Sequence, residues 1–150
     1  MTKYFVSLII LFIIDRSAKV YWLKNPSEDG FFQLHLNANI AFSWPLPIWI
    51  IYPAVMIILF IIIWLWLAAW RTKSNLIWPW GLIIIGAISN LLDRILYKGV
   101  VDFINIEWFT VFNIADIYIS LGVAWILIFE LFINKKHEKK TNCDIVIMAG

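Results

Sequence analysis

The chain has 150 residues, of which 63% are hydrophobic, 17% aromatic and 15% charged, and its formal net charge is +2. Soluble domains average about 45 to 50% apolar and about 25% charged residues, so this composition excludes an ordinary soluble fold. It indicates an integral membrane protein. The mild charge argues against a nucleic-acid partner, and the basic residues suit contact with membrane lipid.

Four apolar stretches are long enough to cross a bilayer, which takes about 20 residues in a helix. They are residues 4–23, 44–70, 75–93 and 111–133, and they leave a tail at about 134–150. The runs are continuous rather than alternating, which argues against barrel strands. We therefore expect an all-α membrane protein with four transmembrane helices and a single domain over residues 1–150.

The first stretch also resembles a secretory signal peptide, because Lys3 is followed by an apolar run from Tyr4 to Ile14. That alternative lacks a small-x-small cleavage signal after the run. The apolar pattern also continues past the charged residues to Leu23. We therefore interpret the stretch as a transmembrane helix with charged residues inside it.

Two connections on the outer side have the pattern of extended chain. Between the first two helices, apolar and polar residues alternate over residues 32–36, which predicts a strand in a small extracytoplasmic segment. Between the third and fourth helices, β-branched and aromatic residues at 100, 101, 103 and 104 favour an extended segment around Asp102.

Basic residues in the short connections predict the orientation of the chain. One side of a four-helix path collects seven of them, namely Lys3, Arg71, Lys73, Lys135, Lys136, Lys139 and Lys140. The other side collects five, namely Arg16, Lys19, Lys24, Arg94 and Lys98. Three of these five lie beside carboxylates and are better assigned to a site. Both termini are therefore expected to be cytoplasmic.

The usual metal and redox ligands are scarce. Cys143 is the only cysteine, so no internal disulfide is possible, and the two histidines, His35 and His137, lie far apart in the sequence. This set does not match the spacing of a zinc site. We expect neither a metal nor a cofactor.

Carboxylates gather where the membrane segments approach the outer side. They are Asp15, Asp93, Asp102 and Asp116, accompanied by the cations Arg16, Lys19 and Arg94. A charged group at the centre of a bilayer costs at least about 2.5 to 3.5 kcal/mol, so each one suggests a function. Aspartates without a His, Cys or Ser partner point to a pair that shares one proton and activates water.

A structural role for these charges is the competing interpretation. Asp15 and Lys19 are four residues apart and can form an ion pair on one helix, and Asp93 beside Arg94 can be structural in the same way. Glu130, toward the opposite end, is expected to extend toward the interface.

Five segments resemble, in order and at about the same spacing, the conserved blocks of the lipoprotein signal peptidases, the signal peptidase II family. They are I13-I-D-R-S-A-K19, N37-A-N-I-A-F-S43, N90-L-L-D-R94, V100-V-D-F-I104 and F112-N-I-A-D116. The resemblance implies a four-helix aspartic endopeptidase of the bacterial inner membrane, with both termini in the cytoplasm. Such enzymes remove signal peptides from lipid-modified prolipoproteins. The resemblance therefore implies that these precursors and membrane lipid are the partners of the chain, and that the chain is a monomer.

The resemblance also implies roles for individual residues. Asp102 and Asp116 occupy the two catalytic positions. Polar positions that line or brace the family's site correspond to Asn37, Asn90, Arg94 and Asn113, and its other charged positions to Asp15, Lys19 and Asp93. The chain departs from the family pattern at Ala18, Asn39 and Ser89, and we expect these departures to affect substrate fit more than hydrolysis.

The expected mechanism is general acid and base catalysis by the Asp102 and Asp116 pair. If Asp116 begins the fourth helix, the helix dipole favours its anionic form, which makes it the initial base. The strand at residues 32–36 and Trp44 are expected to cover the site.

Two other functions remain open. One is a protein of the same architecture that binds lipid-anchored segments without cutting them. The other is a proton-coupled transporter, which would spread its acids across the membrane rather than gather them on one side.

Overall fold

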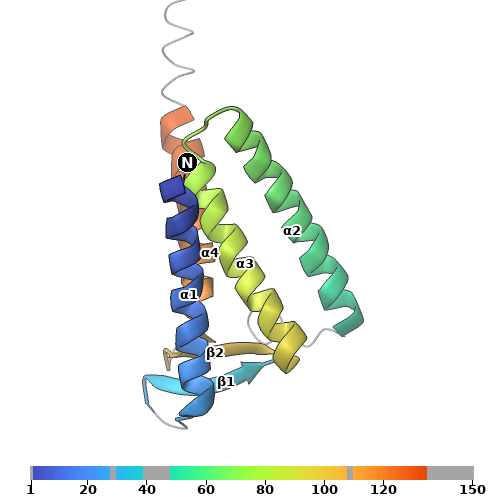
Figure 1. Ribbon diagram of the computed structural model, residues 1–150, viewed down its shortest axis with the longest axis vertical. Coiled ribbons are helices and arrows are strands. Elements are labelled where there is room, and N and C mark those ends of the chain that lie inside the picture. The colour runs from blue at the N-terminus through green and yellow to red at the C-terminus, as the bar shows by residue number, and fades with distance from the viewer. Residues whose placement is uncertain (1, 28–29, 39–47, 108–109, 135–150) are drawn as a thin grey trace, which may run out of the picture.

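The computed structural model describes residues 2–27, 30–38, 48–107 and 110–134, which form four long helices and a small sheet (Figure 1). In chain order the elements are α1 (Thr2–Lys24), β1 (Phe32–Asn37), α2 (Ile48–Arg71), α3 (Ile77–Tyr97), β2 (Val100–Asn105), β3 (Val111–Phe112), α4 (Ile114–Ile128) and the π-helix η2 (Phe129–Asn134).

The helices run roughly side by side, and the sheet lies across one end of them (Figure 1). α3 occupies the middle, where it contacts α1, α2 and α4, while α2 leans away from the other helices toward the sheet end. The start of α1 and the α2–α3 connection lie at the opposite end from the sheet. The fold thus separates a sheet end from an end that carries the N-terminus.

Two glycines let α3 and α4 approach closely. A Cβ atom at Gly86 would lie 2.5 Å from the carbonyl oxygen of Ala115, and one at Gly122 would lie 2.7 Å from that of Pro79. Small residues at contacts between membrane helices allow this backbone proximity. The packing at Gly86 places the first turn of α4 directly against α3.

The sheet is antiparallel, in the order β1-β2-β3. His35 lies opposite Asp102, and Asn37 lies opposite Val100. Because alternate residues of a strand point to the same face, Asn37 and Asp102 share one face of the sheet. The ring of Trp22, at the end of α1, stacks on Phe32 at a centroid distance of 5.0 Å and anchors the sheet to the helices.

Three of the described helices are long and apolar enough to cross a membrane, namely Trp49–Arg71, Ile77–Tyr97 and Ile114–Leu131. Large apolar side chains are exposed on their outer surfaces, as for Phe60 at 72%, which suits helices surrounded by lipid. α1 is as long as the others, but Asp15, Arg16 and Lys19 interrupt its apolar run. Its crossing of the membrane therefore remains a prediction.

The expected strand at residues 32–36 and the extended segment around Asp102 are both confirmed, as β1 and β2. The two segments pair in one sheet, so the β structure belongs to two connections and not only to the first. The third helix continues to Tyr97, one turn beyond the expected end at 93, and so includes Arg94.

The expected fourth helix at 111–133 was wrong at its start. Val111 and Phe112 pair with β2 as β3, and α4 begins only after Asn113. The β-branched and aromatic pair suits a strand, and the Asn113 side chain caps the helix that follows. Outside the described residues lie Asn39, Trp44, His137, Cys143 and the part of the tail beyond residue 134.

Candidate active site

Asp102 lies in β2 with a residue exposure of 3%. The side-chain amide of Asn113 donates a hydrogen bond to its Oδ1 at 2.6 Å. Asn37, on β1, donates to its Oδ2 at 3.3 Å, as their shared face of the sheet allows. Both oxygens of this buried carboxylate thus accept hydrogen bonds from asparagine side chains.

Asp116 lies in the first turn of α4, where it forms a capping box with Asn113. The Asn113 side chain accepts a hydrogen bond from the backbone N–H of Asp116, and the Asp116 carboxylate accepts one from the backbone N–H of Asn113, each at 3.1 Å. The amide of Asn90, on α3, donates to the other carboxylate oxygen at 2.8 Å. The first turn of a helix also favours negative charge.

Asn113 therefore links the two carboxylates. Its side-chain N–H donates to Asp102 while its backbone N–H donates to Asp116, and the residue is 0% exposed. A third bond, from the Asn113 side chain to Oδ1 of Asn90 at 3.2 Å, joins the pair to α3. Asn113 and Asn90 thus hold β2, α3 and the start of α4 together around the two carboxylates.

Burial raises the pKa of Asp102 from its usual value of 3.8 to about 7, with a further contribution from the nearby charge of Asp116. Hydrogen bonds from Asn113 and Asn37 lower this pKa because they favour the ionised form. Asp102 is therefore close to half protonated near neutral pH. It can carry a proton under conditions in which an exposed aspartate cannot.

The carboxylates face a cavity of about 920 Å³ between the sheet, α2, α3 and α4. Its polar lining near the sheet includes Asn37, Asn90, Arg94, Asp102 and Asp116. The apolar walls include Val55, Ile58 and Leu59 from α2 together with Ile117, Leu121 and Ala124 from α4. One cavity thus combines a polar end with an apolar passage along the helices.

Arg94 lines the cavity near the end of α3. One of its guanidinium nitrogens donates to the backbone carbonyl of Asn90 at 3.3 Å. The hydroxyl of Tyr52, on α2, donates to the backbone carbonyl of Arg94 at 2.8 Å. Tyr52 thus joins α2 to α3 beside the polar end of the cavity, a role that no local sequence pattern indicates.

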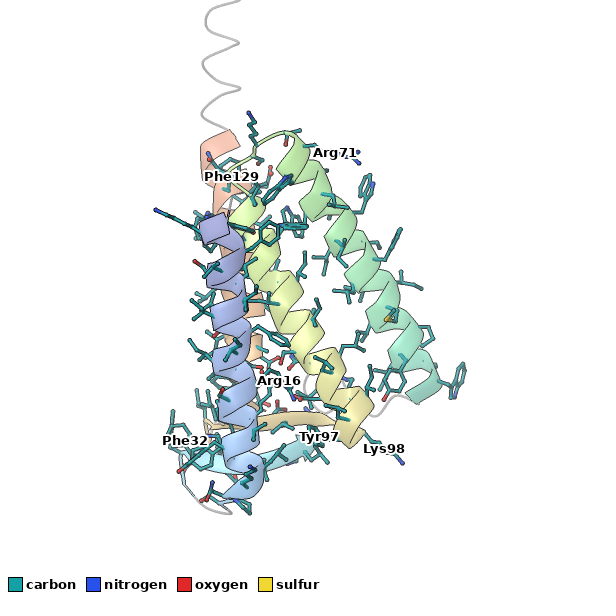
Figure 2. The ribbon with its side chains drawn as sticks, viewed as in Figure 1. Arg16, Phe32, Arg71, Tyr97, Lys98 and Phe129 are labelled. Carbon is teal, nitrogen blue, oxygen red and sulfur yellow. The ribbon has the colours of Figure 1, made fainter. Side chains whose placement is uncertain are left out.

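A second cluster of charges joins α1 to α3. Lys19 lies 2.7 Å from Oδ2 of Asp93 and 3.4 Å from Oδ2 of Asp15, and all three side chains are between 0 and 1% exposed. Arg16 forms an ion pair with the other oxygen of Asp93 and lies between α1 and α3 (Figure 2). These pairs brace the two helices.

The charged cluster also contacts α4. Oδ1 of Asp15 accepts a hydrogen bond from the backbone N–H of Ala115 at 2.8 Å, next to Asp116 in the sequence. The predicted pair of Asp15 with Lys19 is therefore confirmed, and Asp15 supports the start of α4 as well. Asp93, beside Arg94 in the sequence, pairs with Arg16 and Lys19 of α1.

Arg16, expected only as one of the cations assigned to a site, and Ser89, expected only as a departure from the family pattern, both belong to the charged cluster. The Ser89 hydroxyl donates to Asp15 at 2.5 Å and is 1% exposed. Its side chain thus bonds to α1. The sequence spacing could have placed Ser89 in this cluster, because Ser89 and Asp93 are four residues apart and share a helix face. Ser89, a position at which the chain departs from the family pattern, thus supplies a hydroxyl to this cluster.

The structure brings nearly all the expected site residues into two connected groups. Asp102, Asp116, Asn37, Asn90 and Arg94 line the cavity, and buried Asn113 bridges the two aspartates. The charged group of Asp15, Lys19 and Asp93 connects to this set through Asn90. Within the described ranges, no group of three or more His, Cys, Asp or Glu residues is arranged to hold a metal ion.

Comparison with known sequences places the chain among membrane peptidases. The family model described as signal peptidase (SPase) II matches residues 7–132. A lipoprotein signal peptidase from Bartonella quintana (strain Toulouse) is 36% identical over 157 residues, covering 92% of this chain and 93% of the relative. One from Pelagibacter ubique (strain HTCC1062) is 32% identical over 154 residues, covering 91% and 92% respectively.

Two solved structures, both described as bacterial membrane enzymes and obtained by the in meso method, share the fold. The first, at 2.3 Å resolution, has a TM-score of 0.71 and 24% identity, covering 93% of this chain and 92% of that chain. The second, at 1.9 Å, has a TM-score of 0.73 and 24% identity, covering 88% and 94%. Since the family model and the sequence relatives span most of its length, the chain belongs to the signal peptidase II family of bacterial membrane peptidases.

Proposed function

We propose that the chain is an aspartic endopeptidase that removes signal peptides from lipid-modified prolipoproteins, with Asp102 and Asp116 as its catalytic pair. Membership of the family supports the activity and the substrate class. The observation that carries the residue assignment is the link through Asn113, which bonds to both carboxylates at the polar end of one cavity. Such a pair can share one proton and activate water without a metal.

The surroundings of the two carboxylates suggest different starting roles. Asp102, with its pKa raised to about 7, holds the proton. Asp116 accepts hydrogen bonds from Asn90 and from the backbone of Asn113 at a helix N-terminus, which favours its ionised form. Asp116 is accordingly the initial base. The two groups interact, so the pH dependence of the reaction belongs to the pair.

The reaction consumes one water for each peptide bond. Asp116 takes a proton from water while the water oxygen bonds to the scissile carbonyl carbon, and Asp102 gives its proton to the carbonyl oxygen. The tetrahedral intermediate then breaks its C–N bond. Asp116 passes its proton to the leaving nitrogen, and the hydroxyl proton returns to Asp102. The products are a carboxyl group and an amine, and the pair recovers its starting protonation.

The shape of the cavity suits a substrate that arrives from lipid. Its apolar walls, formed by α2 and α4, lie along helices whose outer faces are apolar. A signal peptide and the acyl chains of a lipid-modified precursor can therefore lie against side chains such as Leu59 and Leu121, with the scissile bond near the carboxylates. β1 covers this end through Asn37.

The same proposal includes the topology. α1 joins the three apolar helices as a fourth transmembrane helix in one integral domain, and the chain acts as a monomer in the bacterial inner membrane. Arg71 ends α2 and Lys73 lies in the α2–α3 connection, which is at the same end as the start of α1, while the sheet that contains Asp102 lies at the other end (Figure 1). The positive-inside rule then places both termini in the cytoplasm and the carboxylates near the outer face.

A processing assay with the purified full chain tests the proposal. The protein is placed in lipid nanodiscs with a lipid-modified prolipoprotein, and the released signal peptide is quantified by mass spectrometry. Wild type should cut, whereas Asp102→Asn and Asp116→Asn should each lower kcat by about 10³-fold or more, as loss of a catalytic group commonly does. Glu107→Gln is the matched control, because Glu107 is an exposed carboxylate next to the sheet.

Each alternative gives a different result in the same assay. A non-catalytic protein of this architecture would bind the precursor without releasing a signal peptide, even from the wild-type chain. Full processing by either Asp variant would remove that residue from the catalytic pair. A transporter would instead show proton flux in sealed vesicles that depends on Asp102 and Asp116, with no cleavage.

A further inference from the structure

Lys19 is a fully buried cation that the proposed mechanism does not use. Its ammonium contacts Asp93 at 2.7 Å and Asp15 at 3.4 Å, which ties α1 to α3. It also donates to Oδ1 of Asn90 at 2.8 Å. Burying a cation is costly, and bracing two helices does not require the Asn90 contact. That contact connects the charged cluster to the carboxylate pair.

Asn90 is the only step between Lys19 and Asp116 along this path of hydrogen bonds. Its Oδ1 accepts from Lys19, and its Nδ2 donates to Oδ1 of Asp116 at 2.8 Å. The same Oδ1 accepts from the side chain of Asn113 at 3.2 Å, and Asn113 in turn donates to Asp102. The orientation of one amide therefore determines which groups the carboxylates meet.

The two ends of an asparagine amide are nearly equal in size, so partners rather than shape select its orientation. A lysine ammonium donates hydrogen bonds and accepts none, so the end of Asn90 that faces Lys19 must be the oxygen. The NH₂ group must then face Asp116. In the reversed orientation, two donors would meet at Lys19, and the Asn90 oxygen would face the carboxylate of Asp116.

We propose that Lys19 is a positioning residue that holds the Asn90 amide in the orientation that donates to Asp116. This keeps an N–H group aimed at the carboxylate that serves as base, and it keeps the Asn90 oxygen available to Asn113. The inference rests on the proposed function, since it assigns Lys19 a part in the same reaction. Lys19 acts on the chemistry through Asn90.

Arg16 offers a matched comparison within the same cluster. It lies on α1, is a cation, and pairs with Asp93, as Lys19 does. Its other contacts in the described part of the chain are with Ser89, both Oγ and the backbone oxygen, at 3.4 Å. Arg16 thus braces α1 against α3 without reaching Asn90. A role limited to bracing predicts similar consequences for the loss of either cation.

The test measures kcat and KM per folded molecule for Lys19→Met and Arg16→Met in nanodiscs, with a lipid-modified precursor peptide. Loss of a residue that orients a metal ligand commonly costs about 10- to 100-fold in activity, and we expect a similar cost for a residue that orients Asn90. Lys19→Met should lower kcat by about that factor with KM little changed. Arg16→Met should lower Tm and leave kcat within about threefold, because Asn90 keeps its orientation.

A double-mutant cycle with Asn90→Ala separates positioning from bracing. If Lys19 acts through Asn90, Lys19→Met in an Asn90→Ala background should cause no further loss of kcat. Arg16→Met in that background should keep the small effect it has alone. If the fold losses of kcat caused by Lys19→Met and by Asn90→Ala multiply in the double variant, the inference is overturned. A Lys19→Met enzyme with wild-type kcat would also overturn it.

A charge-balanced variant covers the case in which Lys19→Met does not fold. Asp15→Asn combined with Lys19→Met removes one charge of each sign and leaves the Arg16 and Asp93 pair in place. The positioning role predicts that this variant has a kcat well below that of Asp15→Asn alone, and a purely ionic role predicts that the two variants have the same kcat. Failure of the proposed function would look different, because then wild type would not cut, or Asp102→Asn would cut normally.

Discussion

The side-chain amide of Asn113 donates to Oδ1 of Asp102 at 2.6 Å, joining the residue that caps α4 to a carboxylate in β2. The backbone of the same asparagine holds Asp116 in the capping box. Asn113 therefore determines both where α4 starts and how the two carboxylates are placed. A helix cap and the proposed catalytic pair depend on the same few atoms.

Replacement of Asn113 should separate capping from catalysis. Asn113→Ser keeps a good N-cap oxygen but loses the amide that reaches Asp102, so kcat should fall about 10²-fold, in the range seen for the loss of a preorganised hydrogen-bond donor. Asn113→Ala should show a similar loss of kcat and should also lose about 1 kcal/mol of stability with the cap. Steady-state kinetics and thermal unfolding in detergent check both effects. Wild-type kcat in Asn113→Ser would contradict the bridging role.

The pH dependence of kcat should report the proton on Asp102. With its pKa raised to about 7, Asp102 is protonated below that value and ionised above it, so kcat should decline as pH rises through about 7. The hydrogen bond from Asn37 lowers this pKa, so Asn37→Ala should move the decline to higher pH. A rate profile from pH 5 to 9 measures the shift. A decline that moves to lower pH would contradict the assigned effect of Asn37.

The same raised pKa makes a prediction about stability. A carboxyl group with a folded pKa above its unfolded value adds stability when protonated, and this is lost as pH rises through about 7. Asp102→Asn removes the cost of ionising a buried group. At pH 8 it should therefore melt roughly 2 to 8 °C above wild type, and this advantage should shrink toward pH 5. Differential scanning fluorimetry in detergent at the two pH values tests the sign.

Filling the apolar wall should impair binding while the carboxylate pair stays intact. Ala124 lines the cavity on α4, so Ala124→Phe should raise KM for a lipid-modified precursor about tenfold or more by occupying space meant for the substrate. Val123→Phe is the matched control, because the neighbouring Val123 is 43% exposed but is not among the residues that line the cavity. It should leave KM nearly unchanged. Equal effects of the two variants would argue that the substrate does not use this wall.

Several features could be predicted from local sequence. The apolar runs predicted the helices because the length and hydrophobicity of a membrane helix are local properties. Alternation over residues 32–36 predicted β1 for the same reason. The start of the fourth helix was wrong, because the apolar character of Val111 and Phe112 suits a strand as well as a helix. Their pairing with β2 decided between the two.

The site was predictable in part. The cost of charge near a membrane selected four aspartates and three cations, and the resemblance to lipoprotein signal peptidases ranked Asp102 and Asp116 above the rest. Spacing along a helix predicted the pair of Asp15 with Lys19. The partners of Ser89, Arg16 and Tyr52 were not predicted, since each bonds to a residue on a different helix.

The sequence by itself determined that this is a membrane protein with four aspartates gathered toward one edge, because composition and hydrophobic length decide that without reference to contacts. Only the tertiary structure decided which groups meet. Asn113 reaches back to Asp102, Lys19 reaches Asn90, and Arg16 pairs with Asp93. The last two join residues more than 70 positions apart, so the packing of α1 on α3 makes these contacts and no local pattern encodes them.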